Sequence, residues 1–242
     1  MNFQDSQQPC AVIIGLDSLQ GLQTARILAR RQVPVIGIAK NFKYHSCKTR
    51  VCQDILFTNT DNEELVKLLQ TLGPQLNQKA VLFPCQDRNV RVISRHRREI
   101  EEWFHIVLPP PDVVDMLIDK VSFYTFAQEQ GLPIPPTFFL HSKQDAKKAA
   151  QELRFPCLLK PPFRPQSWTQ HTKVKAIKAH TPEELLAIYD HYHAWIDTLI
   201  VQEWIEGADS NHFTCNCYFD ANLPRSLVNR GVHNISNSNT SY

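Results

Sequence analysis

A run of residues near position 200 combines side chains that would bind a flat heterocyclic ligand. Leu199 to Val201 have the composition of a buried strand, and Glu203, Trp204 and Ile205 then place a carboxylate, a large ring and a branched apolar side chain side by side. Glu206 to Asp209 form a glycine-containing turn with two further carboxylates. Taken alone, the segment also fits a plain hairpin with a polar turn.

A lysine upstream favours the ligand-binding interpretation. Lys160 follows the short apolar strand expected over Phe155–Leu159 and precedes Pro161. An ammonium group is costly to bury without a partner, so Lys160 should contact an anion. A phosphate group suits it, because lysine acts as a compact point charge.

A second lysine, Lys120, follows Asp119 on a helix that we expect from Asp112 to Gln130. Gly131 suits the left-handed cap of that helix, and Pro133 cannot continue it. By itself, Lys120 equally fits a helix lysine whose charged end reaches solvent.

These segments, in this order along the chain, resemble the ATP-grasp superfamily, and most closely its carboxylate-amine ligase branch, which includes the D-aspartate ligases. The matching segments are Asp119-Lys120, residues 131–135, Leu159-Lys160-Pro161 and residues 201–207. Several segments in a fixed order are more specific than any one of them. The resemblance covers roughly residues 10 to 220 and implies an incomplete ATP-grasp domain of the α+β class.

The resemblance implies ATP as the cofactor and assigns residues to its parts. Lys120 and Lys160 would neutralise the phosphates. Asp209 would accept hydrogen bonds from the ribose, with Glu206 as the alternative acceptor and a role in an Asx-type turn as the alternative for Asp209. The adenine hinge, with backbone groups pairing to the base edge, would consist of Glu203, Trp204 and Ile205. No catalytic residue is identified.

The reaction that the resemblance implies is the ATP-dependent joining of a small carboxylate to an amine through an acyl-phosphate. Positioning and charge neutralisation would be the protein's contributions. Two alternatives stay open: a non-catalytic nucleotide-binding remnant or fragment, and a Rossmann-like NAD oxidoreductase.

Magnesium (Mg2+) would bridge the phosphates in the resembled family, where an acidic pair and an asparagine after the hinge bind it. This chain has no Asp or Glu after Asp220, so we expect no metal ligands there. Residues 212–219 alternate between apolar and polar types and predict a half-buried strand. Residues 223–242 are rich in Ser and Asn without apolar periodicity, which predicts a disordered or atypical tail. A fragment, an alternative ending and a degenerate homologue all fit this pattern.

The first part of the chain alternates strands with helices, which predicts a parallel sheet. The expected strands are Cys10–Gly15, Val33–Ala39, Ala80–Cys85 and Ile106–Leu108, and the expected helices are Leu19–Arg31, Asp61–Leu72 and Asp87–Phe104. The prolines at 109–111 mark a boundary. We therefore expect an α/β protein: a pre-ATP-grasp (Rossmann-like) domain over residues 1–110, an ATP-grasp domain over 111–222 and the tail over 223–242.

The glycines Gly15 and Gly21 raise the possibility of a dinucleotide site. That site needs a GxGxxG turn and an acidic residue after the second strand. The turn here reads GLDSLQG, and the second strand ends in Lys40-Asn41. Both requirements fail. The resembled pre-ATP-grasp domains instead help to hold the carboxylate substrate.

Two polar segments have open roles. Arg88, Arg91, Arg95 and Arg98 form one stripe of a helix, which a solvated face explains, although the preceding Gln86-Asp87 ends a parallel strand, where α/β sheets bind ligands. Residues 160–178 lack the glycine-rich phosphate loop of the family. Side chains available to the phosphates instead are Arg164, Ser167, Trp168, His171 and Lys173.

Composition sets the remaining limits. The 242 residues are 43% hydrophobic and carry a net charge of +2, which favours a globular protein and gives no reason to expect nucleic acid or a membrane as partner. The seven cysteines lack a repeated CxxC pair, so free thiols in the cytoplasm are expected. The sequence leaves the two substrates and the oligomeric state undecided.

Overall fold

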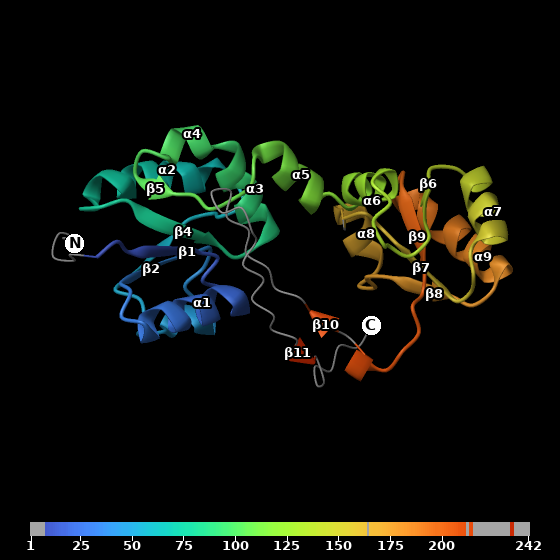
Figure 1. The fold of residues 1–242 in the computed structure, drawn as a ribbon, viewed down its shortest axis with the longest axis horizontal. Helices are drawn as coiled ribbons and strands as arrows, with labels where there is room; N and C mark the ends of the chain where they lie inside the picture. The colour runs from blue at the N-terminus through green and yellow to red at the C-terminus, as the bar shows by residue number, and fades with distance from the viewer. Residues whose placement is uncertain (1–7, 164, 212, 215–232, 235–242) are drawn as a thin grey trace. The chain divides into compact units, whose positions relative to one another are not determined.

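The computed structural model describes residues 8–163, 165–211, 213–214 and 233–234, and every structural statement below refers to these ranges (Figure 1). The chain divides into two compact units between Asp119 and Lys120.

The first unit contains a five-stranded parallel sheet with the strand order β3-β2-β1-β4-β5 (Figure 1). Its strands are β1 (Ala11–Ile14), β2 (Val35–Ala39), β3 (Asp54–Phe57), β4 (Ala80–Pro84) and β5 (Phe104–His105). Its helices are α1 (Leu19–Arg30), α2 (Glu63–Leu72), α3 (Asp87–Arg95), α4 (Arg97–Ile100) and α5 (Pro111–Ile118), with 3-10 turns at His45–Lys48 and Gly73–Gln75. The predicted parallel α/β sheet is confirmed.

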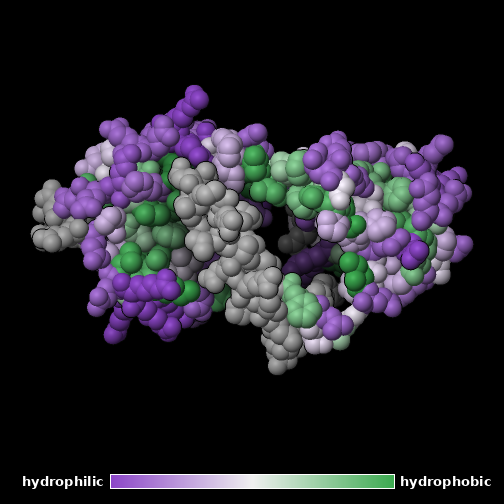
Figure 2. Space-filling view, viewed as in Figure 1, coloured by the Kyte–Doolittle hydropathy of each residue, from purple (hydrophilic) through white to green (hydrophobic). Residues whose placement is uncertain are grey.

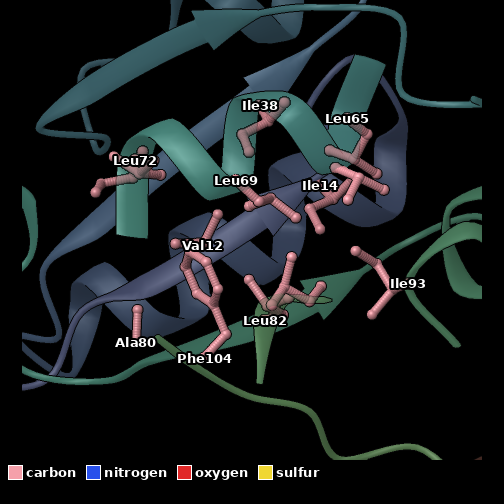
Figure 3. Packing of buried hydrophobic residues seen from close by; sticks show 13 residues of the cluster. Val12, Ile14, Ile38, Leu65, Leu69, Leu72, Ala80, Leu82, Ile93 and Phe104 are labelled. Atoms are coloured by element: carbon pink, nitrogen blue, oxygen red, sulfur yellow. The ribbon is translucent and has the colours of Figure 1, made fainter. Parts of the chain in front are cut away.

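Both faces of this sheet are buried. Val12 and Ile14 of β1 pack with Leu65 and Leu69 of α2 on one face, as Figure 3 shows. The intervening Ile13 belongs to a second cluster on the other face, together with Ala25 of α1 and partners such as Val33. Burial on both faces explains why these strands are continuous apolar runs in the sequence.

The two glycines near β1 have structural roles. Gly15 has φ +85°, and a side chain there would meet the Asn89 amide oxygen at 2.8 Å. A side chain on Gly21 would overlap the Gly15 carbonyl oxygen, so glycine allows α1 to approach the β1 turn closely. Ser18 caps α1, since its hydroxyl accepts from the Gly21 N–H at 3.0 Å. These contacts account for both glycines without a dinucleotide.

Three sequence predictions for the first unit are wrong in detail. The helix expected over 87–104 ends at Arg95, because His96 leaves helical geometry at φ −100° and ψ 20°. The last strand is Phe104–His105 instead of 106–108, because the buried Phe104 pairs with Ala80. The edge strand β3 had no counterpart among the predicted elements, since its four residues are only partly buried or exposed.

The helix predicted from 112 to 130 is two helices. The first, α5, stops at Ile118, and the second, α6 (Lys120–Glu129), starts after an extended residue, Asp119, with φ −85° and ψ 115°. The periodicity of apolar residues cannot distinguish one helix from two that follow each other without a loop. The break coincides with the division between the two units.

The second unit contains a four-stranded antiparallel sheet with the order β6-β9-β7-β8. Its strands are β6 (Thr137–Leu140), β7 (Cys157–Lys160), β8 (Ile177–Ala179) and β9 (Leu199–Glu203). Besides α6, its helices are α7 (Lys143–Glu152), α8 (Gln166–His171) and α9 (Pro182–Tyr192), with 3-10 turns η4 (His193–Trp195) and η5 (Asp209–Asn211). A two-residue pair joins β10 (Phe213–Thr214) to β11 (His233–Asn234). The rest of the predicted 212–219 strand and of the 223–242 tail lies outside the described residues.

One face of this second sheet forms the core of the unit. Leu159, Leu199 and Val201 are buried in one cluster with Ala146 of α7 and Leu185 of α9, and Figure 1 shows both helices on the same side of the strands. Helix α9 begins with an N-cap, because the Thr181 hydroxyl accepts from Glu184 N–H at 3.2 Å. The Phe155–Pro156 peptide bond that precedes β7 is cis.

Hydrophilic residues predominate on the visible face of each unit in Figure 2. Within the described ranges, no helix combines the length and the apolar character that crossing a membrane requires. The five described cysteines are all free, and Cys157 is fully buried.

Candidate functional site

The face of the second sheet opposite its core carries polar side chains from three strands. Lys160 pairs in register with Ile200, and Leu158, two residues before Lys160, pairs with both Gln202 and Lys178. Because side chains alternate between the faces of a sheet, Lys160, Gln202 and Lys178 all project from the face that α7 and α9 do not cover. We call this surface the open face.

Lys160 is half-buried on the open face and is held by neutral groups. Its Nζ donates hydrogen bonds to the Tyr124 hydroxyl at 3.0 Å and to Gln202 Oε1 at 3.1 Å. Among the described residues, no carboxylate forms an ion pair with Lys160, whereas Lys40 and Lys143 each pair with an aspartate. Lys160 therefore keeps an uncompensated positive charge where the sequence predicts a phosphate, and the phosphate contact itself stays a prediction.

Lys120, the other predicted phosphate ligand, is the exposed first residue of α6. Tyr124 lies four residues later on the same helix, and residues spaced by four share one helix face. Because the Tyr124 hydroxyl contacts Lys160, Lys120 lies on the stripe of α6 that faces towards Lys160. The structure thus places the two predicted lysines on the same side of the second unit.

The predicted hinge follows directly from β9. Glu203 ends the strand, and its carboxylate turns away from the open face to accept a hydrogen bond from Arg154 N–H at 2.9 Å. The N–H groups of Glu203 and Trp204 donate to the carbonyls of Pro136 and Pro156. Ile205 is 74% exposed, and its N–H has no partner in the part of the chain that the structure describes. Of these three N–H groups, that of Ile205 is thus the one available to a base.

The Trp204 ring contacts Lys178 of the open face. Lys178 Nζ lies 4.6 Å from the centroid of its ring, the geometry of a cation–π contact. Asp209, the predicted ribose ligand, begins the turn η5, and Glu206, the alternative, is exposed. The roles predicted for both carboxylates stay predictions.

Three residues of this site were missing from the sequence-based set: Tyr124, Lys178 and Gln202. For two of them the sequence contains a signal. Tyr124 is spaced by one helical turn from Lys120, and Gln202 is an uncommon polar residue in an otherwise apolar strand. Their meeting at Lys160 depends on strand register, which the sequence pattern does not supply.

The prediction for residues 164–173 is wrong for Trp168. Trp168 is 0% exposed and donates from Nε1 to the Val174 carbonyl at 2.9 Å. The Ser167 hydroxyl donates to the Trp195 carbonyl, and His171 stacks on the Trp195 ring. Trp168 therefore packs in the core of the unit and does not contact phosphates. Ser167 and His171 are exposed, and their phosphate contacts stay predictions. Arg164 lies outside the described residues, and Lys173 is exposed.

Among the described residues, the structure places neither a thiolate nor a cluster of metal ligands on the open face. Burial, with a smaller contribution from the charge of Glu203, raises the pKa of the Cys157 thiol to about 11, so it is neutral at physiological pH. In the described part of the chain, no three His, Cys, Asp or Glu side chains converge as metal ligands would.

The first unit has a cavity of its own between α2, α3 and the end of α5, with a volume of about 610 Å³. Arg88, Arg91 and Arg95 of α3 line it. Asp115 lies 3.1 Å from Arg91 and 3.2 Å from Arg95, and Asp61 lies 3.0 Å from Arg88, so two carboxylates pair with three guanidinium groups. The solvated-face interpretation holds for Arg88, whose side chain is 78% exposed, but the stripe also borders a cavity.

The structure is similar to solved structures of a synthetase and of a ligase. One is N5-carboxyaminoimidazole synthetase from Staphylococcus aureus complexed with ADP, at a TM-score of 0.58 and 13% identity over 84% of this chain and 50% of that one. Another is the L-amino acid ligase from Bacillus licheniformis, at a TM-score of 0.55 and 11% identity over 84% and 45%. At these identities the similarity establishes the fold, which is that of the ATP-grasp enzymes.

In sequence, the chain is 30% identical over 165 residues to the D-aspartate ligase of Enterococcus faecium (strain Aus0004), which covers 65% of this chain and 39% of that ligase. No protein-family model matches. In sequence and in fold, the chain is therefore similar to the ATP-grasp ligases. It spans less than half the length of the curated relative it matches here.

Proposed function

We propose that this chain carries the ATP-binding part of an ATP-dependent carboxylate-amine ligase, and that the nucleotide lies on the open face. The observation that carries the proposal is Lys160, a half-buried cation whose described partners are both neutral. A cation in that setting is stabilised by an anionic ligand, and the adjacent Trp204–Ile205 segment offers an apolar surface and an N–H donor to a base.

The residues divide into groups by the part of ATP that each would contact. Lys160 and Lys120 would offset phosphate charge, and Ile205 would pair with the base through its N–H and pack on its face. Trp204 would line the same pocket, while Asp209 would accept from the ribose. Glu203 would act through its backbone, because its carboxylate is bound to Arg154 N–H on the opposite face.

In the proposed reaction, a carboxylate oxygen attacks the terminal phosphorus of ATP, and ADP leaves. The amine then attacks the carbonyl carbon of the acyl-phosphate, and phosphate leaves with formation of the C–N bond. The contribution of Lys160 is to hold and neutralise the phosphates during transfer. The described residues do not offer a converging set of oxygen ligands for magnesium, so no step is assigned to that ion.

The carboxylate substrate has a candidate binding region in the first unit. The cavity beside α3 presents Arg91 and Arg95, and their guanidinium groups share the single carboxylate of Asp115. Guanidinium groups bind carboxylates through paired hydrogen bonds. This region would bind the carboxylate before its activation.

Calorimetry with ATP, ADP, adenosine and NAD tests the proposed function. We expect ATP to bind more tightly than NAD for two reasons. The glycines in the turn after β1 serve packing. The position after β2, where a dinucleotide site needs an acidic residue for the ribose, is occupied by Lys40, which pairs with Asp61. Measurable NAD binding without ATP binding would reject the ATP-grasp function in favour of the oxidoreductase.

A further inference from the structure

Lys160 does not hold its position alone, because a chain of hydrogen bonds leads from it to the backbone. Lys160 Nζ donates to Gln202 Oε1 at 3.1 Å. Gln202 Nε2 donates to Thr137 Oγ1 at 2.8 Å, and the Thr137 hydroxyl donates to the Pro135 carbonyl at 2.7 Å. We call this series, from Pro135 through Thr137 and Gln202 to Lys160, the relay.

The Pro135 carbonyl at the end of the relay determines which group donates in each of its hydrogen bonds. A carbonyl oxygen has no proton, so the single hydroxyl proton of Thr137 goes to Pro135. Thr137 Oγ1 is then restricted to accepting, and it must receive the N–H of the Gln202 amide. This sets the amide orientation of Gln202, which places its oxygen, and not its NH2 group, beside Lys160.

Thr137, in the middle of the relay, is buried. Thr137 is 6% exposed, and its backbone carbonyl accepts a hydrogen bond from Gln128 Nε2 at 2.7 Å. Thr137 also pairs in register with Gln202 across β6 and β9, so the two side chains are neighbours on adjacent strands. A series of hydrogen bonds that passes through a buried side chain favours one arrangement over others.

The relay leaves one hydrogen-bond donor of Lys160 available to a ligand. An ammonium group has three N–H donors, and Gln202 and Tyr124 accept two of them. Within the described residues the third makes no hydrogen bond, and Nζ also lies 5.0 Å from the centroid of the neutral Tyr124 ring. Both acceptors are neutral, so they orient Lys160 without compensating its charge, and the third donor and the full charge stay available to a ligand.

We propose that Gln202 is a positioning residue for Lys160, oriented by Thr137, and that its neutral amide keeps the lysine charged and directed towards the phosphates of ATP. The proposal rests on the proposed function for the identity of the ligand, whereas the positioning of Lys160 can be measured without any nucleotide.

The first experiment measures that positioning directly. The intact chain, without nucleotide, is treated with N-hydroxysuccinimidyl acetate, and the acetylation rate of each lysine is read by peptide mass spectrometry. Exposed Lys147 and Lys148 on α7 are internal standards. Thr137→Val removes the hydroxyl at similar size, and we expect Lys160 to react about 3-fold to 10-fold faster relative to the standards, as for loss of one hydrogen bond. Thr137→Ser keeps the hydroxyl and should react at the wild-type rate.

The second variant separates orientation from charge. Gln202→Glu retains an acceptor beside Lys160 but adds a negative charge, so Lys160 should react more slowly than in the wild type. ATP binding should nevertheless weaken about 10-fold, because the new carboxylate competes with the phosphates for Lys160. Adenosine has no phosphates, so its binding should change less. A structural defect would weaken both ligands equally.

Each outcome decides something. An unchanged Lys160 rate in Thr137→Val, or an equal rise at Lys160 and the α7 standards, would overturn the relay. Equal losses for ATP and adenosine in Gln202→Glu would overturn the positioning role. If the wild-type chain binds no ATP while Thr137→Val still accelerates Lys160 labelling, the proposed function fails and the relay stands as a structural device.

Discussion

The two sheets of this protein differ in how many of their faces are closed. The first sheet is parallel and is buried on both faces, so its polar side chains gather at strand ends and in the helices around it. The second is antiparallel and is covered by α7 and α9 on one face, which leaves Lys160, Gln202 and Lys178 on the other. On this second face Lys178 lies within its strand and Lys160 ends its strand, whereas β1, β2 and β4 of the doubly covered sheet are apolar throughout.

The largest expected effect comes from opening the closed face of the second unit. Trp168→Ala should destabilise this unit by about 3 to 5 kcal/mol, because it removes a fully buried ring that packs against Tyr192 and Trp195. Hydrogen exchange should rise in β7 and β9 and stay unchanged in β1 and β4. Trp168→Phe is the matched control, with a smaller loss. Equal deprotection of both sheets would contradict the separation of the two cores.

The corresponding change in the first unit is Gly21→Ala. The added methyl group would overlap the Gly15 carbonyl oxygen, and forcing atoms into a packed site costs about 1 to 3 kcal/mol. Amides of α1 and β1 should exchange faster, and Gln23→Ala, at an exposed position of the same helix, should have little effect. If the amides of Gly21→Ala exchange as slowly as those of the wild type, α1 can move away from the sheet without loss of stability, which would contradict this prediction.

The open face is tested by Lys160→Met and Asp209→Ala. Loss of a hydrogen bond to a charged group amounts to about 1.5 to 3 kcal/mol. Lys160→Met should therefore weaken ATP about 10-fold or more and adenosine little, while Asp209→Ala should weaken both by a similar factor. Lys143→Met, which removes an exposed lysine paired with Asp190, is the control. Calorimetry measures all three, and equal losses of ATP and adenosine in Lys160→Met would remove the phosphate role.

The smallest expected effect is a pH dependence of the first unit at Asp61. Burial alone would raise the pKa of this carboxyl, but hydrogen bonds and charges from Lys40 and Arg88 outweigh it and lower the pKa below its usual value. Its stabilising contribution is thus complete above about pH 4 and is lost as the pH falls through the lower folded-state pKa. Denaturant unfolding of Asp61→Asn should show a weaker loss of stability below pH 4 than the wild type. Asp190→Asn, in an exposed ion pair, serves as the comparison, and identical acid profiles for Asp61→Asn and wild type would contradict the assignment.

The sequence was most informative where local patterns and packing agree. The apolar runs at β1, β2 and β4 identified the parallel sheet, because strands buried on both faces need apolar residues throughout. The ordered motifs around Lys120, Lys160 and Trp204 predicted the similarity to ATP-grasp ligases that the sequence relatives also show. The cap of α9 could be read directly, since capping needs only neighbouring residues.

Contacts between distant residues were decided by the tertiary structure alone. Trp168 could equally have been a ligand contact or a core residue, and only the space beside Tyr192 and Trp195 made it core. The carboxylate of Glu203 turned from the predicted base site to Arg154, because alternation along β9 places it on the covered face. Gln202 lies beside Lys160 because of the register between the two strands β7 and β9. Residue types and spacing thus determined which chemistry this chain could carry, whereas strand pairing, which joins residues more than 40 positions apart, decided which side chains meet to perform it.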